Sequence, residues 1–449
     1  MFKKIGSFFI SIVMLFLSIF GISFKHNNRV INLYMSDYKI TGKNEKTDEL
    51  KEIFDEVIQR QPTVRIDESR KPFADDNRIS AIYFDGQEYN GKASKVFAYI
   101  GFPENASSDT PVPAMVLVHG GMGHAYAQWV QYWVNNGYAA ISVDGFGQHP
   151  EAGLYKGDDD LDSWSVNPDS HMTIDELQSA DKPFREQWFY HYISDVILAN
   201  TIISSDKKVN SDKVGITGIS WGSIATSVAI CYDNRFSFAI PVYGSAFLNH
   251  STGLIGDVCR KEGYIDAWEP SHLLDTIDIP ILYVNGDNDP FFSANCTTAS
   301  AANAKHAAVT YVHCLAHGQN PGAYQPEVLR FANEQTGMGN GNIKIDKVSF
   351  DGNRAIVSFN APDDVTNLKA CVYYRNTELE YDGFNLKQEW KKKNGIDLDG
   401  TANIKIPKDA TMFYIAVQGK IGKIFDRDTI QGTTGIYTSE IIKEKTSIQ

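Results

Sequence analysis

The sequence is short of basic residues, and this shortage limits the partners that it can bind. Its 42 Lys and Arg stand against 55 Asp and Glu, which gives a net charge of −13. Binding to a nucleic acid or docking on anionic lipid needs a clustered basic surface, so neither fits this charge balance. An acidic excess of this kind favours solubility.

Cysteines are also few, and their spacing excludes the common metal sites. The five cysteines form no CxxC pair and no Cys/His pattern of the kind that binds zinc. We therefore expect no metal and no cofactor. Cys231 and Cys314 lie in apolar segments and are predicted to be buried thiols, whereas Cys259 and Cys296 could form a disulfide. An odd number leaves at least one thiol unpaired in an exported chain.

The N-terminus carries an export pattern. Lys3 and Lys4 precede an apolar run from Ile5 to Phe24. A positive segment followed by an apolar one is typical of a secretory signal, and this run is almost long enough to span a bilayer. Residues 1–24 are predicted to be a signal peptide or an N-terminal membrane anchor. The rest of the chain is expected to be secreted or extracytoplasmic, with a membrane tether only through this segment.

The 449 residues exceed what one hydrophobic core normally organises. Residues 25–338 are predicted to form the first domain, with an extension over 25–78 and an acidic insertion over 149–182. The extension contains an amphipathic helical pattern over 47–60. After it, two alternating runs predict paired strands, 79–84 and 95–102.

Short, wholly apolar runs then alternate with helical stretches, a pattern typical of a mostly parallel sheet with helices on both faces. The predicted buried strands are 114–118, 138–143, 213–219, 238–243, 279–284 and 309–315. The predicted helices are 125–136, 186–205, 223–232 and 326–333. The fold class is therefore α/β, with a doubly wound sheet.

A glycine-rich segment, 335–342, separates this domain from the last part of the chain. Beyond it only strand-like runs with turn residues between them remain, so residues 339–449 are predicted to form a small all-β sandwich. The predicted strands are 347–360, 370–375, 402–406, 411–418 and 437–442. This domain could bind carbohydrate or simply pack on its neighbour. Trp390, its only tryptophan, fits either role.

The strongest chemical motif is Gly218–Gly222, which has the pattern G-x-S-x-G with Ser220 at its centre. A predicted strand runs into it and a helix rich in small residues leaves it. A tight strand-to-helix turn needs small flanking residues, and it lifts the serine hydroxyl above the strand ends. We therefore expect Ser220 to be a nucleophile.

A serine needs a base, and the base needs an acid that orients it. In a fold of this kind the acid and then the histidine follow the serine along the chain. Asp289 follows a predicted buried strand and fits the acid, with Asp287 as its rival. His317 follows the next strand and fits the base. His313 is predicted to lie inside that strand and His306 in a helical stretch before it.

His119-Gly120-Gly121-Met122-Gly123 follows the first buried strand of the parallel series. Glycines let backbone N–H groups approach a substrate oxygen, so this turn and the Trp221 N–H are predicted to form an oxyanion hole. Either Gly121 or Met122 would supply the second donor. His119 itself is expected to be a structural contact beneath the site.

These motifs resemble the α/β-hydrolase superfamily over about residues 80–335. The helical stretch 186–205 and the segment 209–215 are similar to its acetyl xylan esterase, dienelactone hydrolase and prolyl-oligopeptidase-like branch. Similar secreted hydrolases also carry a β-sandwich after the catalytic domain. Trp221 is bulkier than the residue usually found at that position of the motif, and the acidic insertion is long.

The insertion includes Asp158, Asp159, Asp160 and Asp162. It could form a lid, and a solvated loop is favoured over a calcium site because the glycine expected at the sharp turn is absent. Four aromatic residues could line a sugar cleft or belong to the core, namely Trp164, Trp188, Tyr190 and Tyr192.

The sequence thus predicts a secreted serine carboxylic-ester hydrolase that removes small, acetyl-type acyl groups from a carbohydrate or related ester through an acyl-enzyme. One alternative is a serine exopeptidase of the prolyl-oligopeptidase-like type. Another is a non-catalytic binding protein that keeps the fold. The sequence does not set the oligomeric state.

Overall fold

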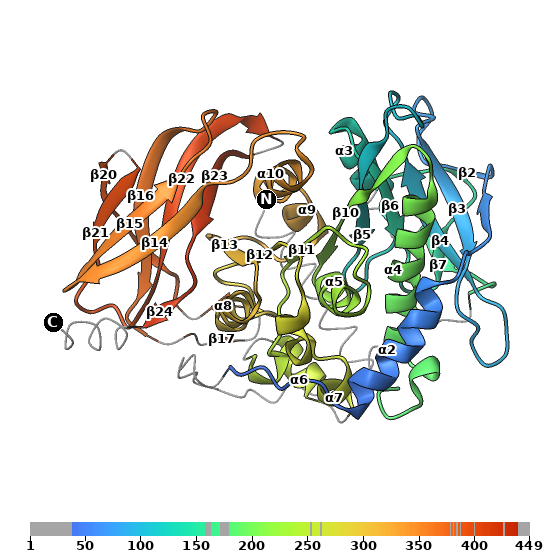
Figure 1. Cartoon of the computed structure of the whole chain (residues 1–449), viewed down its shortest axis with the longest axis horizontal. Helices are drawn as coiled ribbons and strands as arrows, with labels where there is room; N and C mark the ends of the chain where they lie inside the picture. Colours follow the sequence, from blue (N-terminus) through green and yellow to red (C-terminus); the bar gives the residue numbers. More distant parts are fainter. Residues whose placement is uncertain are drawn as a thin grey trace.

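The computed structural model describes most of the chain (Figure 1). The described residues are 38–157, 163–170, 179–251, 254–260, 263–377, 379, 381–382, 385–386, 388–398, 400–424 and 427–438. The predicted N-terminal signal and the aspartates 158–162 lie outside these ranges. Within them, none of the helices pairs the length with the apolar character that a bilayer crossing requires.

A nine-stranded sheet organises the first domain, in the order β1-β3-β4-β6-β5-β10-β11-β12-β13. Strands β5, β6 and β10 to β13 are parallel, whereas β1, β3 and β4 pair antiparallel at one edge. The strands are β1 (Val64–Ile66), β3 (Ile79–Asp85), β4 (Lys95–Gly101), β5 (Val112–Val118), β6 (Ala139–Val143), β10 (Val209–Ile219), β11 (Phe238–Val242), β12 (Ile281–Gly286) and β13 (Ala307–Val312).

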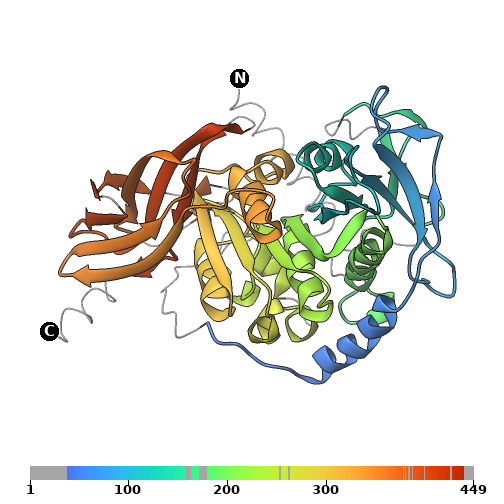
Figure 2. The same cartoon turned by 45° about the horizontal axis from the view of Figure 1, so that its top comes forward.

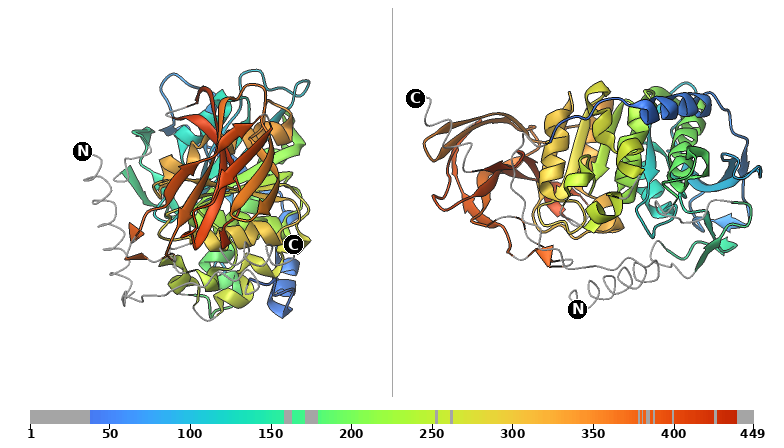
Figure 3. Two further views of the ribbon diagram at one scale, coloured as in Figure 1. Left: turned by 90° about the vertical axis from the view of Figure 1, so that its left-hand side faces the viewer. Right: turned by 90° about the horizontal axis from the view of Figure 1, so that it is seen from below.

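Helices cover both faces of this sheet (Figure 2). The main ones are α2 (Glu45–Ile58), α3 (Ala127–Asn135), α4 (Trp188–Ser205), α5 (Trp221–Tyr232), α8 (Ala294–Asn303) and α10 (Pro326–Thr336). Helix α4 is apolar around nearly its whole circumference because it lies between the sheet and α2. Phe54 of α2 packs on Tyr190 of α4 and Tyr232 of α5, with ring centroids 5.9 and 5.1 Å apart. The right-hand view of Figure 3 shows α2 outside the other helices.

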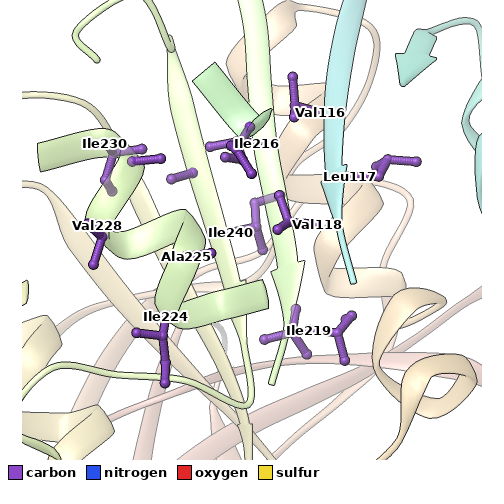
Figure 4. Packing of buried hydrophobic residues seen from close by; sticks show 14 of the residues in the cluster. Val116, Leu117, Val118, Ile216, Ile219, Ile224, Ala225, Val228, Ile230 and Ile240 are labelled. Atoms are coloured by element: carbon purple, nitrogen blue, oxygen red, sulfur yellow. The ribbon is translucent and has the colours of Figure 1, made fainter. Parts of the chain in front are cut away.

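The middle of the sheet is dry on both faces, as the wholly apolar runs predict. Val116, Ile216 and Ile240 come from the adjacent strands β5, β10 and β11, and all three are fully buried. Figure 4 shows these side chains with Ile224 and Val228 of α5. This packing fixes the strand ends that carry the site.

Short elements fill the connections between the main ones. They are β2 (Arg70–Lys71), β7 (Gln148–Pro150), β8 (Gly153–Leu154), β9 (Trp164–Val166), η3 (Phe184–Glu186), η4 (Leu248–His250), α6 (Leu254–Cys259), α7 (Tyr264–Ala267), η5 (Pro270–His272), η6 (Leu274–Thr276) and α9 (Gln319–Ala323). The predicted insertion 149–182 therefore contains short strands, two of which, β7 and β9, pair with each other.

The C-terminal part consists mainly of two antiparallel sheets that face each other (Figure 3, left). We call them the outer sheet, β14-β15-β21-β20, and the inner sheet, β19-β16-β22-β23 with β24. The outer strands are β14 (Lys344–Asp351), β15 (Arg354–Asn360), β21 (Thr401–Lys405) and β20 (Ile396–Leu398). The inner strands are β19 (Lys391–Asn394), β16 (Thr366–Arg375), β22 (Met412–Ile424), β23 (Arg427–Thr433) and β24 (Tyr437–Thr438). A separate short hairpin joins β17 (Tyr381–Asp382) to β18 (Asn385–Leu386).

The predicted sandwich agrees with these sheets, and the predicted boundary at 338/339 falls between α10 and β14. Helix α10 ends at Thr336, and Gly337 follows it with a left-handed φ of 74°. That conformation suits glycine and ends the helix. The run 347–360 is a hairpin of two strands, β14 and β15, and not one strand.

One prediction about the cysteines is wrong, since Cys314 is exposed and not buried, and Cys231 is only partly buried. The disulfide that the sequence left open is not formed, because Cys259 and Cys296 are separate buried thiols. None of the five cysteines forms a disulfide in the structure.

Candidate active site

Ser220 occupies a sharp turn between β10 and α5. Its backbone adopts φ 57° and ψ −117°, a region that non-glycine residues rarely enter. The Ser220 N–H donates to the carbonyl of Val242 at the end of β11, at 2.9 Å. The neighbouring strand thus holds the strained turn in place, as expected where strain serves a function.

The two flanking glycines are required by this turn. A methyl group at Gly218 would overlap the carbonyl of Gly222. A methyl group at Gly222 would overlap the carbonyl oxygens of Val118 and His119, at the end of β5. The motif therefore follows from the close approach of helix α5 to the strand ends.

The structure brings the predicted acid and base to this serine. Asp289 follows β12 and His317 follows β13, and both strands end at the same edge of the sheet as β10. The Nε2 atom of His317 lies 2.9 Å from Ser220 Oγ, and its Nδ1 atom lies 2.6 Å from Asp289 Oδ2. An ionised carboxylate only accepts, so Nδ1 carries the proton and Nε2 is free to accept from the serine hydroxyl.

Asp289 is aimed by its own loop. Its Oδ1 atom accepts from the N–H groups of Phe291 and Phe292, at 2.9 and 2.8 Å. This leaves Oδ2 for His317 and keeps the carboxylate in one orientation, although the side chain is buried. Such charge-assisted bonds are stronger than neutral ones.

The imidazole of His317 is enclosed by aromatic rings. The ring centroids of Phe291 and Tyr243 lie 4.5 and 4.6 Å from it. The Tyr243 hydroxyl also donates to the carbonyl of Ala316 at 2.7 Å. Sequence reasoning missed both residues. Tyr243 ends the predicted strand 238–243, and Phe291 lies two residues after Asp289. Nothing in the spacing of either residue indicated a contact with the histidine.

The predicted oxyanion turn passes directly beside Ser220. A Cβ on Gly120 would lie 3.1 Å from Ser220 Cβ, and one on Gly121 would lie 2.7 Å from the Trp221 indole. Met122 has a φ of 60° within the same turn. Trp221 opens α5, where the first N–H groups have no partner within the helix. The turn therefore lies against Ser220 and the Trp221 side chain, and the oxyanion hole formed by Trp221 with Gly121 or Met122 stays a prediction.

His119 lies beneath this turn as a neutral, fully buried side chain. The Gly145 N–H donates to Nε2 at 2.8 Å, so Nδ1 holds the ring proton and donates to the Gly120 carbonyl at 2.7 Å. Burial lowers the pKa of His119 to about 3, which keeps the ring neutral at physiological pH. His119 therefore ties the oxyanion turn to the loop after β6.

That loop begins with Asp144, a carboxyl group in an unusual state. One oxygen accepts from the N–H groups of Phe146 and Gln148. The other is buried with no hydrogen-bond partner. Burial raises the pKa of Asp144 to about 7, because desolvation disfavours the charged form.

This group should make stability depend on pH. In the unfolded chain the pKa of Asp144 stays near 3.8. Between about pH 4 and pH 7 the folded state thus holds more protons, and the free energy of unfolding falls as the pH rises. An Asp144→Asn variant should be about as stable as the parent at pH 5 and more stable at pH 8. Melting temperatures at both values test this, with the exposed Asp212→Asn as a control that should show no such difference.

The aromatic residues of α4 belong to the core. Trp188, Tyr190 and Tyr192 are all buried. The Trp188 indole donates to the Gly145 carbonyl at 2.9 Å, and the Tyr192 hydroxyl donates to the His119 carbonyl at 2.5 Å. These three cannot stack on a sugar. Trp164 is half-buried and stacks on His124 at 4.0 Å.

The rival acid and the rival histidines lie elsewhere. Asp287 bonds to His313, whose Nδ1 lies 2.7 Å from Asp287 Oδ2. The prediction that His313 lies inside a strand is wrong, since β13 ends at Val312. His306 lies in the turn before β13 and not in a helix. The hydrogen bond to Asp287 raises the pKa of His313.

One group of possible metal ligands occurs among the described residues, and it consists of Asp287, His313 and Cys314. Both oxygens of Asp287 already accept hydrogen bonds, from the Cys314 N–H at 3.0 Å and from His313. These contacts explain the cluster without an ion.

Comparisons with known proteins bear on the fold of the first domain. An acetyl xylan esterase from Paenibacillus sp. R4 superposes with a TM-score of 0.51 at 17% identity, covering 67% of this chain and 98% of that one. The chain has the α/β-hydrolase fold. Residues 31–253 match the family model "Acetyl xylan esterase (AXE1)". This range includes the Ser220 turn and ends before Asp289 and His317.

Two further matches have different activities in their names. Acetyl xylan esterase 1 from Thermoanaerobacterium sp. JW/SL YS485 gives a TM-score of 0.45 at 13% identity, over 64% of this chain and 95% of that one. Dipeptidyl aminopeptidase BIII from Pseudoxanthomonas mexicana is 24% identical over 245 residues, 48% of this chain. The aligned part spans only 32% of that peptidase.

Proposed function

We propose that this protein is a serine ester hydrolase that removes small acyl groups of acetyl type from a carbohydrate or related ester. The hydrogen-bonded chain from Ser220 through His317 to Asp289 carries this proposal, with distances of 2.9 and 2.6 Å. The family match of residues 31–253 supports an ester as the substrate. The predicted N-terminal signal supports a secreted or extracytoplasmic location.

In this reaction Ser220 Oγ attacks the acyl carbon while His317 Nε2 takes the hydroxyl proton. The carbonyl oxygen becomes an anion, which the N–H of Trp221 and that of Gly121 or Met122 stabilise. The imidazolium, held by Asp289, gives its proton to the leaving alcohol. An acyl-enzyme remains, and water repeats the sequence to release the acid and free Ser220. The residues need no cofactor for these steps.

A serine exopeptidase is the second candidate, and the partial match to a dipeptidyl aminopeptidase favours it. The two candidates share the same nucleophile and differ in the leaving group. A peptidase must also bind a peptide terminus, which an acetyl esterase does not need.

A substrate panel separates the two candidates. We expect turnover of 4-nitrophenyl acetate and of acetylated xylan, with kcat/KM falling as the acyl chain lengthens from acetyl to butyryl. Dipeptidyl 4-nitroanilides should be turned over much more slowly. Faster cleavage of the anilides than of the acetyl esters would favour the exopeptidase. The Ser220→Ala variant gives the background rate for every substrate.

A further inference from the structure

Within the inner sheet of the C-terminal domain, strands β16 and β22 have segments that are buried on both faces. Along β16, Ala370 and Val372 belong to the core between the two sheets, whereas Cys371 and Tyr373 belong to the core of the first domain. Along β22, Phe413 and Ile415 face the sandwich, and Met412, Tyr414 and Ala416 face the first domain. Strand side chains alternate between faces, so one sheet serves two cores.

The face toward the first domain meets the two loops that carry the candidate acid and base. We define the Asp289 loop as residues 286–292 and the His317 loop as residues 313–318. The Tyr414 hydroxyl donates to Asp287 Oδ2 at 2.9 Å, and the Trp390 indole donates to the Asp287 carbonyl at 2.8 Å. Trp390 is buried, so it is a core residue and not a platform for a ligand.

Asp287 joins three parts of the molecule. Its backbone precedes Asp289 by two residues, and its fully buried carboxylate accepts from His313 Nδ1 at 2.7 Å and from the Cys314 N–H at 3.0 Å. It thereby ties the Asp289 loop to the start of the His317 loop. The Tyr414 hydroxyl completes its set of donors from the other domain.

Aromatic packing holds this link in one geometry. Tyr373 stacks on Tyr414 with ring centroids 4.9 Å apart and planes at 9°. Tyr373 also contacts the His313 ring at 4.9 Å. Trp390 meets Tyr414 edge-on at 5.1 Å. The three aromatic residues of the C-terminal domain therefore fix both the donor hydroxyl and the histidine on either side of the carboxylate.

We propose that Asp287, held by Tyr414, is a positioning residue that sets the spacing between Asp289 and His317, so that the C-terminal domain acts on catalysis. This inference rests on the proposed ester hydrolysis. A misplacement of about 1 Å can lower a rate by about 100-fold. Asp287 is placed to prevent such a shift because its hydrogen bonds join the two loops a few residues from Asp289 and His317.

Tyr414→Phe and Asp287→Asn in the full chain test the proposal. Tyr414→Phe keeps the stacked ring and removes one donor, so kcat for 4-nitrophenyl acetate should fall about tenfold. Asp287→Asn should lower kcat about 100-fold. KM should change little in both, and the rate of labelling of Ser220 by a fluorophosphonate should fall with kcat. Labelling needs the serine and its base but no bound acetyl ester, so it reports their geometry.

The double variant distinguishes a positioning role from a general loss of stability. Because Tyr414 acts through Asp287, the double variant should be no slower than Asp287→Asn alone. Tyr437→Phe is the matched control, since it removes a hydroxyl from a ring stacked on Phe413 in the same domain. Its kcat should equal that of the parent. Melting temperatures identify any variant that loses activity by unfolding.

Several results would overturn the proposal. Unchanged kcat in Tyr414→Phe and Asp287→Asn, multiplied losses in the double variant, or a lower melting temperature with no change in labelling rate would each contradict it. In those cases the parent still cleaves the ester and labels at Ser220, so the proposed function stands. A parent that neither cleaves nor labels would instead contradict the proposed function, and the inference with it.

Discussion

Replacing Ser220 by alanine is expected to lower kcat for 4-nitrophenyl acetate by about 10⁴- to 10⁶-fold. The Ser220 hydroxyl lies 2.9 Å from His317 Nε2 and is the nucleophile of the proposed reaction. Without it, the histidine could at most activate water, while the oxyanion turn would remain intact. The variant should fold normally because the strained backbone at this position is held by the Val242 carbonyl and not by the side chain.

Steady-state rates and intact mass after fluorophosphonate treatment measure this effect. Ser227→Ala is the matched control, since it makes the same change on the same helix, at a buried serine that bonds to the Ser223 carbonyl. It should keep parental kcat and take up one phosphonyl group. Parental activity in the Ser220→Ala variant would rule out the assigned nucleophile. If neither the parent nor the control is labelled, the non-catalytic binding protein becomes the better interpretation.

Gly222→Ala should have the largest effect on stability. The added methyl group would overlap the carbonyl oxygens of Val118 and His119. These are backbone atoms at the end of a central strand, so relief requires that α5 move away from the sheet. Overpacking of this kind costs about 3 kcal/mol in the free energy of unfolding. The same shift would displace Ser220 from His317, so activity should fall as well.

Denaturant unfolding and ester hydrolysis test this second effect together. Gly422→Ala provides the control, because a Cβ at this position of β22 would meet no heavy atom within 4 Å. It should leave both quantities unchanged. A Gly222→Ala variant as stable and as active as the parent would show that the turn does not need a bare backbone there.

The sequence predicted the elements of the central sheet well because its parallel strands are buried on both faces. A short, wholly apolar run such as 114–118 is typical of a parallel strand that is buried on both faces. The same rule misled at the end of β13. The apolar run continues through Leu315, but Cys314 adopts a φ of 55°, and the chain leaves the sheet after Val312. This difference moved His313 out of its predicted strand.

Asp287 and Asp289 could not be separated by spacing, since both follow the same strand. The local turn separates them. Asp289 accepts from the N–H groups of two residues that follow it, and this aims its free oxygen at His317. The partners of Asp287 lie on the His317 loop and, across the domain interface, on Tyr414. Contacts so distant in sequence leave no local pattern.

In the C-terminal domain, strand prediction failed where polar residues are exposed on both sides. Strand β19 has the sequence Lys-Lys-Lys-Asn, and all four residues are exposed. Its edge position in the inner sheet allows this charged composition. Because the run has no alternation of apolar and polar residues, the sequence does not indicate a strand there. Strand β23 was missed for a related reason, since its sequence Arg-Asp-Thr-Ile-Gln-Gly-Thr has a single large apolar residue although it pairs with β22.

The burial of β16 and β22 on both faces also constrains how this sequence can vary. Neighbouring positions on β16 contact different parts of the molecule. Val372 packs in the core of the sandwich, whereas Tyr373 packs against the first domain beside the loops of the candidate site. At positions such as Val372, several substitutions can be tolerated together when they conserve the total side-chain volume. Substitutions at positions such as Tyr373 also affect contacts with the other domain. Substitutions on the face of β16 toward the first domain should therefore disturb both domains, and a C-terminal domain grafted in place of this one would have to keep the same alternation.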